Sequence, residues 1–250
     1  SFEDIVHVYQ GIDPGYITRE VTNEEFGEAF SRVAPLVGEF GEEVTPIQGV
    51  WIQAQVGERI PRAQRGRFYL NIDDASTNGV DVMREVVRRA SAENIPVQFK
   101  TPMLSHINDR IDNTVLYIPQ EQANRVREIL EDIQAAHPQW FRESTPLFTQ
   151  RIGRGIGYAD DIPSGESYGE IIGRSMERAI QRADTESISV EAAFREEIAR
   201  FGRDPQRPYL REGREDPFEA GRQIREEVIP ILEEEIIDIT HLPNEFAQEY

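Results

Sequence analysis

Lys100 is the most distinctive residue for chemistry in this sequence, because it is the only lysine among 27 basic residues and the other 26 are arginines. Arginine stays protonated near neutral pH, whereas a partly buried lysine can lose its proton. Lys100 is therefore a candidate general base, Schiff-base amine or substrate clamp. A GC-rich or salt-adapted source, in which arginine replaces lysine throughout, explains the same composition without giving Lys100 a role.

A second candidate for chemistry is the segment Arg151-Ile-Gly-Arg154-Gly-Ile-Gly157, which places two arginines among glycines. Backbone amides and guanidinium groups in such a loop can bind an anion. The segment lacks the Gly-Lys-Ser/Thr ending of a nucleotide P-loop and the glycine spacing of a dinucleotide-binding fold. It therefore predicts either an anion-binding loop or a plain connection between elements.

Several other kinds of site are excluded or poorly supported. The sequence has no cysteine, which excludes disulfides, thiolate metal sites and a cysteine nucleophile. Its four histidines lack metal-ligand spacing, and no nucleophile-elbow motif is present, so we predict neither a metal nor another cofactor. His106 is a candidate general acid or an ordinary loop histidine.

Charge and hydropathy restrict the partners. The sequence has 46 acidic residues and a formal net charge of −19, a surface charge that repels nucleic acid and anionic membranes. No apolar run approaches the roughly 18 residues of a membrane span, and no secretory signal is visible. We therefore expect a cytoplasmic protein that binds neither nucleic acid nor membranes.

Hydrophobic periodicity predicts the elements that position these residues. Apolar and β-branched runs are typical of strands, and apolar spacings of three and four are typical of helices. The resulting order, β-α-β-β-α-β, indicates an α+β fold with a mainly antiparallel sheet, helices on one face, and flanking N- and C-terminal helices. Strands are expected at 68–72, 95–100, 114–118 and 146–149, and helices at 78–92 and 119–137.

The two middle strands are expected to form a hairpin. In a hairpin the end of one strand lies beside the start of the next. Lys100 ends strand 95–100, and Asp112 precedes strand 114–118 by two residues. The pattern therefore predicts that Lys100, Arg110 and Asp112 gather at the same end of the sheet.

The flanking segments suggest three regions. We expect an N-terminal helical and strand extension at 1–66, a core at 67–201, and a linker with an acidic helix at 202–250. The flanking elements are expected at 22–37 (helix), 50–56 (strand), 153–166 (glycine-rich loop), 167–183 and 189–201 (helices), 202–217 (linker) and 218–239 (acidic helix).

Short stretches between residues 67 and 182, a little under half of the chain, resemble the HopA-type effector family, which is named for a bacterial type III secretion effector. Their order and spacing carry the resemblance. The matching stretches are Ile95-Pro-Val-Gln-Phe-Lys100, Arg110 with Asp112, Val115-Leu-Tyr117, Thr145-Pro-Leu-Phe-Thr149, Gly155-Ile-Gly157 with Ala159-Asp160, Gly165-Glu-Ser-Tyr-Gly169, and Arg174.

The resemblance implies a lyase. Relatives in class V lanthipeptide and thioamitide biosynthesis eliminate phosphate from threonine or serine of a ribosomal precursor peptide that a separate kinase has phosphorylated. This chemistry needs a base for the Cα proton, here Lys100, and an acid for the leaving group, here His106 or Tyr168. The implied phosphate-binding residues are Arg110, Arg151, Arg154 and Arg174, and the residues implied to line or orient the pocket are Asp112, Tyr117, Thr149 and Ser167.

One departure from the family pattern leaves a second function open. The family has a His-Arg pair near the positions of Ile171 and Ile172, which are both apolar here. Loss of a phosphate-binding arginine at this point favours the alternative of a non-catalytic scaffold that binds the phosphopeptide or the kinase.

Overall fold

The computed structural model describes residues 51–102 and 110–219 continuously, and shorter stretches before them, namely residues 22, 24, 27, 28, 31, 35 and 44–47. The chain divides into two compact units, Ser1–Pro217 and Phe218–Tyr250. All the elements described below belong to the first unit.

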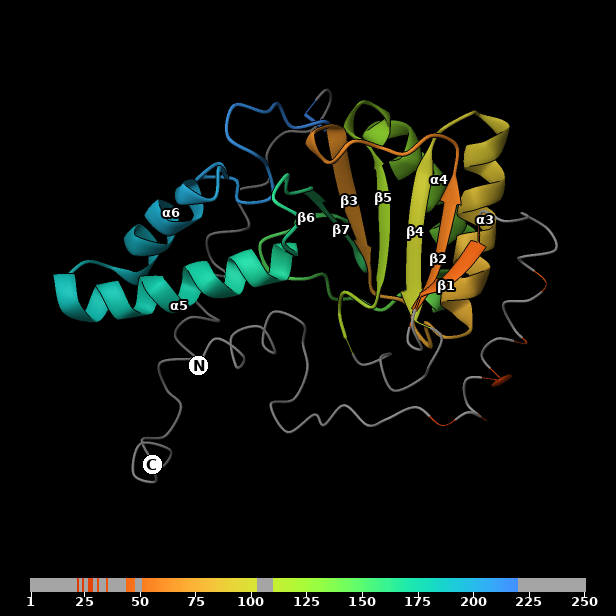
Figure 1. The fold of residues 1–250 in the computed structure, drawn as a ribbon, viewed down its shortest axis with the longest axis horizontal. Coiled ribbons are helices and arrows are strands. Elements are labelled where there is room, and N and C mark those ends of the chain that lie inside the picture. Colours follow the sequence, from red (N-terminus) through yellow and green to blue (C-terminus); the bar gives the residue numbers. More distant parts are fainter. Residues whose placement is uncertain are drawn as a thin grey trace. The chain divides into compact units, whose positions relative to one another are not determined.

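An antiparallel sheet forms the centre of this unit (Figure 1). Its strands follow the order β1-β2-β4-β5-β3-β7-β6, and every neighbouring pair is antiparallel. The strands are β1 (Val44–Ile47), β2 (Trp51–Val56), β3 (Arg65–Leu70), β4 (Val97–Pro102), β5 (Thr114–Pro119), β6 (Gln150–Gly153) and β7 (Ile156–Asp160).

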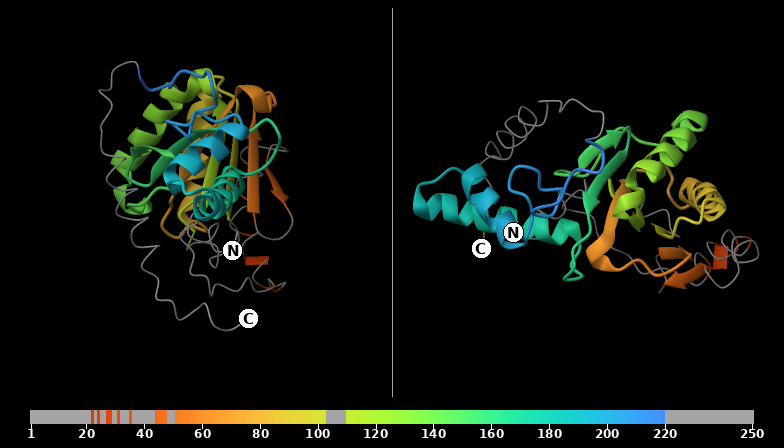
Figure 2. Two further views of the ribbon diagram at one scale, coloured as in Figure 1. Left: turned by 90° about the vertical axis from the view of Figure 1, so that its left-hand side faces the viewer. Right: turned by 90° about the horizontal axis from the view of Figure 1, so that it is seen from above.

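Helices α3 (Asn78–Ala92) and α4 (Ala123–Ala136) cover one face of the sheet (Figures 1 and 2). Both are amphipathic, with buried side chains at spacings of three and four. Gly79 of α3 lies directly against Thr101 and Thr114, whose hydroxyls are 3.0 Å apart. The strand side chains on this face form the core, and they include Phe68, Leu70, Phe99, Leu116 and Ile118.

A second helical pair, α5 (Tyr168–Glu186) and α6 (Val190–Arg200), extends away from the β6–β7 side of the sheet (Figure 2). The start of α5 lies at the opposite face, where the Tyr168 ring is 6.1 Å from that of Tyr69 between centroids. Helix α5 begins with a capping box, in which the Ser167 hydroxyl accepts from the amide of Glu170 and the Glu170 carboxylate accepts from the amide of Ser167. The apolar cluster between these helices and the sheet includes Tyr69, Val115, Ala159, Ile171, Ile172, Phe194 and Ile198.

Most of the predicted core elements are confirmed. The α+β class, the β-α-β-β-α-β order with its antiparallel sheet, and the helix at 78–92 all match, and α5 and α6 lie within a few residues of the two predicted helices. The first core strand begins at residue 65 rather than 68. Short 3-10 helices lie at Arg62–Gln64, Gln120–Gln122 and Pro138–Trp140.

Two predictions near residue 150 are wrong. Residues 146–149 form a turn rather than a strand, because Phe148 has a φ of 61°, which is incompatible with an extended backbone. The expected glycine-rich loop at 153–166 is largely the β6–β7 hairpin, since Gly155 has a φ of 63° and reverses the chain.

The predictions for the flanking segments are tested only in part. The predicted strand at 50–56 corresponds to β2. Residues 24, 27, 28, 31 and 35 are helical, but the rest of the predicted helix at 22–37 and the acidic helix beyond residue 219 lie outside the described residues. Residues 202–217 are irregular and packed, with Arg203 fully buried and the Tyr209 carbonyl accepting from the Asp160 amide at 2.7 Å.

Candidate functional site

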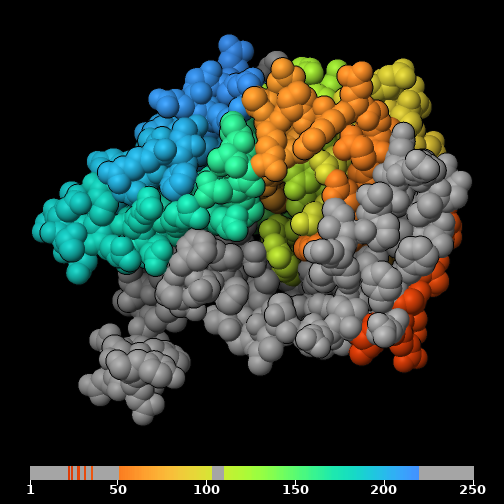
Figure 3. Space-filling view, viewed as in Figure 1, coloured from red at the N-terminus to blue at the C-terminus, as the bar shows by residue number. Residues whose placement is uncertain are grey.

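The face of the sheet opposite α3 and α4 carries the polar side chains of the central strands. Lys100 is paired across β4 and β5 with Val115, and Val115 is paired across β5 and β3 with Tyr69. Paired residues project from the same face of an antiparallel sheet. Lys100 and Tyr69 therefore project from one face on either side of Val115, and in Figure 3 the lime atoms of β5 lie recessed between those of neighbouring strands.

Lys100 lies beside an aromatic ring and a second cation. Its Nζ is 4.2 Å from the ring centroid of Trp51, and Cζ of Arg110 is 5.8 Å from the same centroid. Burial lowers the pKa of the Lys100 ammonium, and the positive charges of Arg110 and Arg67 lower it further, against the opposing effect of Asp112. Among the described residues, no carboxylate forms an ion pair with Lys100. Its amine is therefore neutral at a lower pH than that of an ordinary lysine.

Asp112 holds Arg110 in place. Nε and a terminal nitrogen of Arg110 donate to the two carboxylate oxygens of Asp112 at 2.9 and 3.0 Å. Asp112 is buried, so this bidentate pair fixes the plane of the guanidinium. The predicted gathering of Lys100, Arg110 and Asp112 at one end of the sheet is confirmed.

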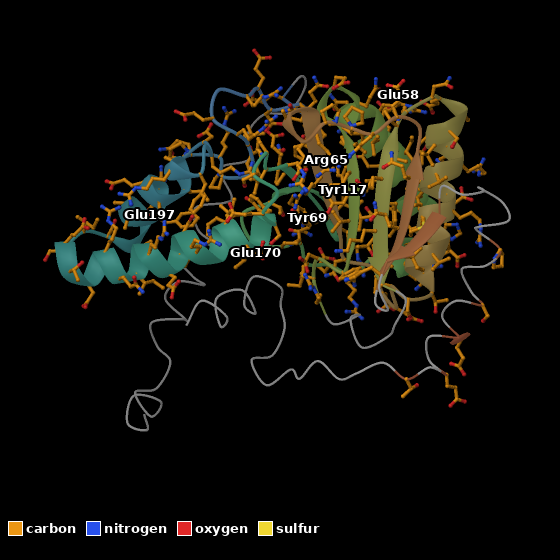
Figure 4. All side chains as sticks on the ribbon, in the orientation of Figure 1. Glu58, Arg65, Tyr69, Tyr117, Glu170 and Glu197 are labelled. Atoms are coloured by element: carbon orange, nitrogen blue, oxygen red, sulfur yellow. The ribbon has the colours of Figure 1, made fainter. Side chains whose placement is uncertain are left out.

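A buried carboxylate organises two further arginines. Asp161, directly after β7, forms ion pairs with both Arg65 and Arg67, and its side chain is fully buried. The two guanidinium groups lie over the ring of Tyr117, at 4.5 and 5.2 Å from its centroid. Figure 4 labels Arg65, Tyr117 and Tyr69 in this part of the sheet. Although burial lowers the pKa of Arg67, Tyr69, Tyr117 and Asp161 raise it by more, so Arg67 is a permanent cation.

Tyr69 lies next to Arg67 on strand β3. A terminal nitrogen of Arg67 donates to the Tyr69 hydroxyl at 3.4 Å. Burial raises the pKa of Tyr69 to about 12, although the charge of Arg67 opposes this shift. The phenol therefore carries its proton at neutral pH.

The predicted residues at the start of α5 lie at the border of this site. Arg174 forms an ion pair of 2.7 Å with Glu166, whose backbone carbonyl lies 3.5 Å from Arg67. Ser167 serves as the N-cap of α5. The Tyr168 hydroxyl donates to the carbonyl of Phe148 at 2.6 Å, and burial raises the pKa of this phenol above its ordinary value.

Three predicted residues, Arg151, Arg154 and Thr149, are not brought to Lys100. Arg151 and Arg154 are exposed and pair with the exposed Glu143. Arg151 lies on β6 and Arg154 in the turn directly after it, and β6 is four strand spacings from β4, or roughly 19 Å. The Thr149 hydroxyl donates to the carbonyl of Pro146 at 2.6 Å. His106 lies outside the described residues.

Several residues that the structure places on the same side of the sheet as Lys100 were not predicted from the sequence. Arg65, Arg67 and Tyr69 are spaced by two on one strand, and this alternation was the available signal that they share a face. Trp51 and Asp161 gave no comparable signal, because only strand pairing brings their distant segments here. The described residues contain no group of three or more acidic or histidine residues suited to a metal ion, and none of the described helices is long and apolar enough to span a membrane.

Solved structures of two bacterial effector proteins are similar to this structure. The structure is similar to that of the effector protein from Pseudomonas syringae pv. tomato strain DC3000, with a TM-score of 0.65 and 19% sequence identity over 85% of this chain and 90% of that one. The effector protein from Pseudomonas syringae pv. syringae strain 61 is similar with a TM-score of 0.63 and 17% identity over the same shares. At these identities the likeness establishes the fold alone. No curated protein sequence matches the chain.

A family model also matches the sequence. The model of the HopA1 effector protein family aligns with residues 48–210, which is more than half of the chain. This match confirms the family resemblance inferred from the short motifs between residues 67 and 182, and it extends over β2 and into the packed segment after α6. The chain therefore belongs to the HopA1 effector protein family.

Proposed function

We propose that this protein is a phosphothreonine/phosphoserine lyase, which eliminates phosphate from a ribosomal precursor peptide after a separate kinase has phosphorylated it. The observation that carries the proposal is the environment of Lys100. This half-buried amine has a pKa lowered by burial and by Arg110, and no carboxylate among the described residues neutralises it. An amine of this kind is suited to take a weakly acidic proton.

In the proposed reaction Lys100 removes the Cα proton of the phosphorylated residue. The electron pair of the C–H bond forms the Cα=Cβ double bond, and the Cβ–O bond breaks toward the phosphate. Arg110 lies beside Lys100 in a plane set by Asp112, and a guanidinium group held in this way is suited to binding phosphate oxygens. Arg67 adds a second fixed positive charge on the same face.

The other predicted phosphate ligands have different roles in this proposal. Arg174 binds at the border of the site and becomes available to the substrate when it leaves Glu166. Arg151 and Arg154 contact at most a distant part of the peptide, because edge strand β6 and the turn after it are remote from Lys100. The formal net charge of −19 repels a phosphopeptide at low ionic strength, so turnover should rise as salt screens this repulsion.

The test is mass spectrometry of a phosphothreonine peptide incubated with the protein at low and high salt. Loss of the elements of phosphoric acid is expected with the wild type and not with Lys100→Ala. Lys100→Arg keeps the charge but cannot act as a base, so it should bind the peptide without turning it over. Arg88→Ala, an exposed change on α3, which covers the other face of the sheet, serves as the matched control and should keep full activity.

The alternative is a non-catalytic scaffold, favoured by one observation. Ile171 and Ile172 are 1% and 2% exposed and belong to the apolar cluster between α5 and the sheet, so no charged side chain reaches the site from these positions. A wild-type protein that binds phosphorylated and unphosphorylated peptide equally well, and never releases phosphate even with its kinase present, supports the scaffold and refutes the lyase.

A further inference from the structure

The hydroxyl proton of Tyr69 has no acceptor among the described residues. Within the described part of the chain, the hydrogen-bond partner of this hydroxyl is a terminal nitrogen of Arg67, and a guanidinium group only donates hydrogen bonds. Tyr69 is 3% exposed, and a buried hydroxyl normally donates its proton to a nearby acceptor. The O–H bond is therefore free to donate to a ligand on this face of the sheet.

Its neighbour Arg67 also points to an anionic ligand. Arg67 is 6% exposed, and its Nε is buried without a hydrogen-bond partner in the structure. Two adjacent donors, a guanidinium N–H and a phenol O–H, are thus left incompletely satisfied at one place. Such donors are suited to the oxygens of a phosphate.

The register of the sheet relates Tyr69 to the proposed base. Lys100 and Tyr69 flank Val115 on strands that are two spacings apart, about 10 Å between backbones. In an elimination the proton that is removed and the oxygen that leaves are attached to adjacent carbon atoms. A long lysine and a tyrosine that rise from either side of Val115 are suited to reach these two positions at once.

We propose that Tyr69 is the catalytic acid that protonates the departing phosphate oxygen. This inference rests on the proposed lyase function and deepens it. As Lys100 takes the Cα proton and the Cβ–O bond breaks, the bridging oxygen takes the Tyr69 proton, so that hydrogen phosphate leaves rather than the far more basic trianion. The phenolate, stabilised by Arg67, regains a proton from solvent, and the Lys100 ammonium loses one to solvent.

The structure favours Tyr69 over Tyr168 for this role. The Tyr168 hydroxyl already donates its proton to the Phe148 carbonyl at 2.6 Å, and the Tyr69 proton has no such acceptor in the described part of the chain. The rings of the two tyrosines are 6.1 Å apart between centroids, so Tyr168→Phe is a matched control variant in the same cluster.

The experiment compares two peptides of one sequence, containing either phosphoserine or S-phosphocysteine. Thiophosphate is a less basic leaving group and depends less on an acid. Tyr69→Phe should lower kcat/KM for the phosphoserine peptide by roughly 100-fold or more. It should cause a much smaller loss for the S-phosphocysteine peptide. Lys100→Ala should abolish both reactions. Tyr168→Phe should leave the ratio of the two kcat/KM values as it is in the wild type.

Equal losses on the two peptides in Tyr69→Phe would overturn the assignment, because a structural defect does not depend on the leaving group. A wild type inert toward both peptides would refute the lyase itself. If Tyr69→Phe does not fold, 3,5-difluorotyrosine at position 69 keeps the hydroxyl and lowers the pKa of the phenol. The alkaline limb of kcat/KM should then move to lower pH, and an unmoved limb would reject Tyr69 as the acid.

Discussion

Asp161→Asn tests how much the buried carboxylate that pairs with Arg65 and Arg67 contributes to the stability of the protein. The Asp161 side chain is fully buried, forms ion pairs with Arg65 and Arg67, and accepts from the amide of Ile162 at 2.7 Å. Asparagine keeps the shape and one acceptor oxygen. It removes the negative charge and leaves two nearby guanidinium groups, whose side chains are 12% and 8% exposed, without a carboxylate.

The expected cost follows from this burial. Breaking a buried ion pair by removing one partner costs about 3–5 kcal/mol, because the remaining charge is left desolvated. For a domain of this size each kcal/mol lowers Tm by about 2–4 °C, so the substitution should lower Tm by roughly 6–20 °C. Loss of the support for Arg67 should also displace the Tyr69 hydroxyl that it contacts.

Thermal unfolding followed by circular dichroism measures this effect, with urea unfolding as a second measure of the free energy. Glu143→Gln is the matched control, because Glu143 pairs with Arg151 and Arg154 but its side chain is 68% exposed. Exposed pairs contribute about 0–1 kcal/mol. A Tm for Asp161→Asn no lower than that of the control would refute the conclusion that a buried carboxylate holds the two arginines.

Three further predictions test other features. The rate of phosphate elimination should rise with pH through the lowered pKa of Lys100, because only the neutral amine accepts a proton, and Arg110→Gln should move this limb to higher pH. Gly155→Ala should destabilise the protein more than Gly213→Ala in urea unfolding, because both have positive φ but only at position 155 does the added methyl meet backbone atoms. Ser167→Ala should cost about 1 kcal/mol in the same assay, through loss of the α5 cap.

Local patterns in the sequence were sufficient where one periodicity decided the structure. The helix at 78–92 was predicted with its observed bounds, because its apolar residues recur at helical spacing and bury one side against the sheet. The same kind of evidence failed at 146–149, where an apolar run is a turn with a left-handed Phe148. A short apolar run does not specify backbone conformation, because packing in the folded chain decides it.

The sequence by itself determined that one lysine stands among arginines, that it lies on a strand, and that Arg110 and Asp112 follow before the next strand. It placed Lys100 at the end of that strand, whereas β4 continues to Pro102. Only the tertiary structure decided which groups surround its amine. Trp51 reaches Lys100 because β2 pairs with β4, and Tyr69 reaches the same face because β3 inserts beside β5. Strand order depends on which strand faces are buried against the rest of the protein across the whole sheet, and no local spacing of residues encodes this order.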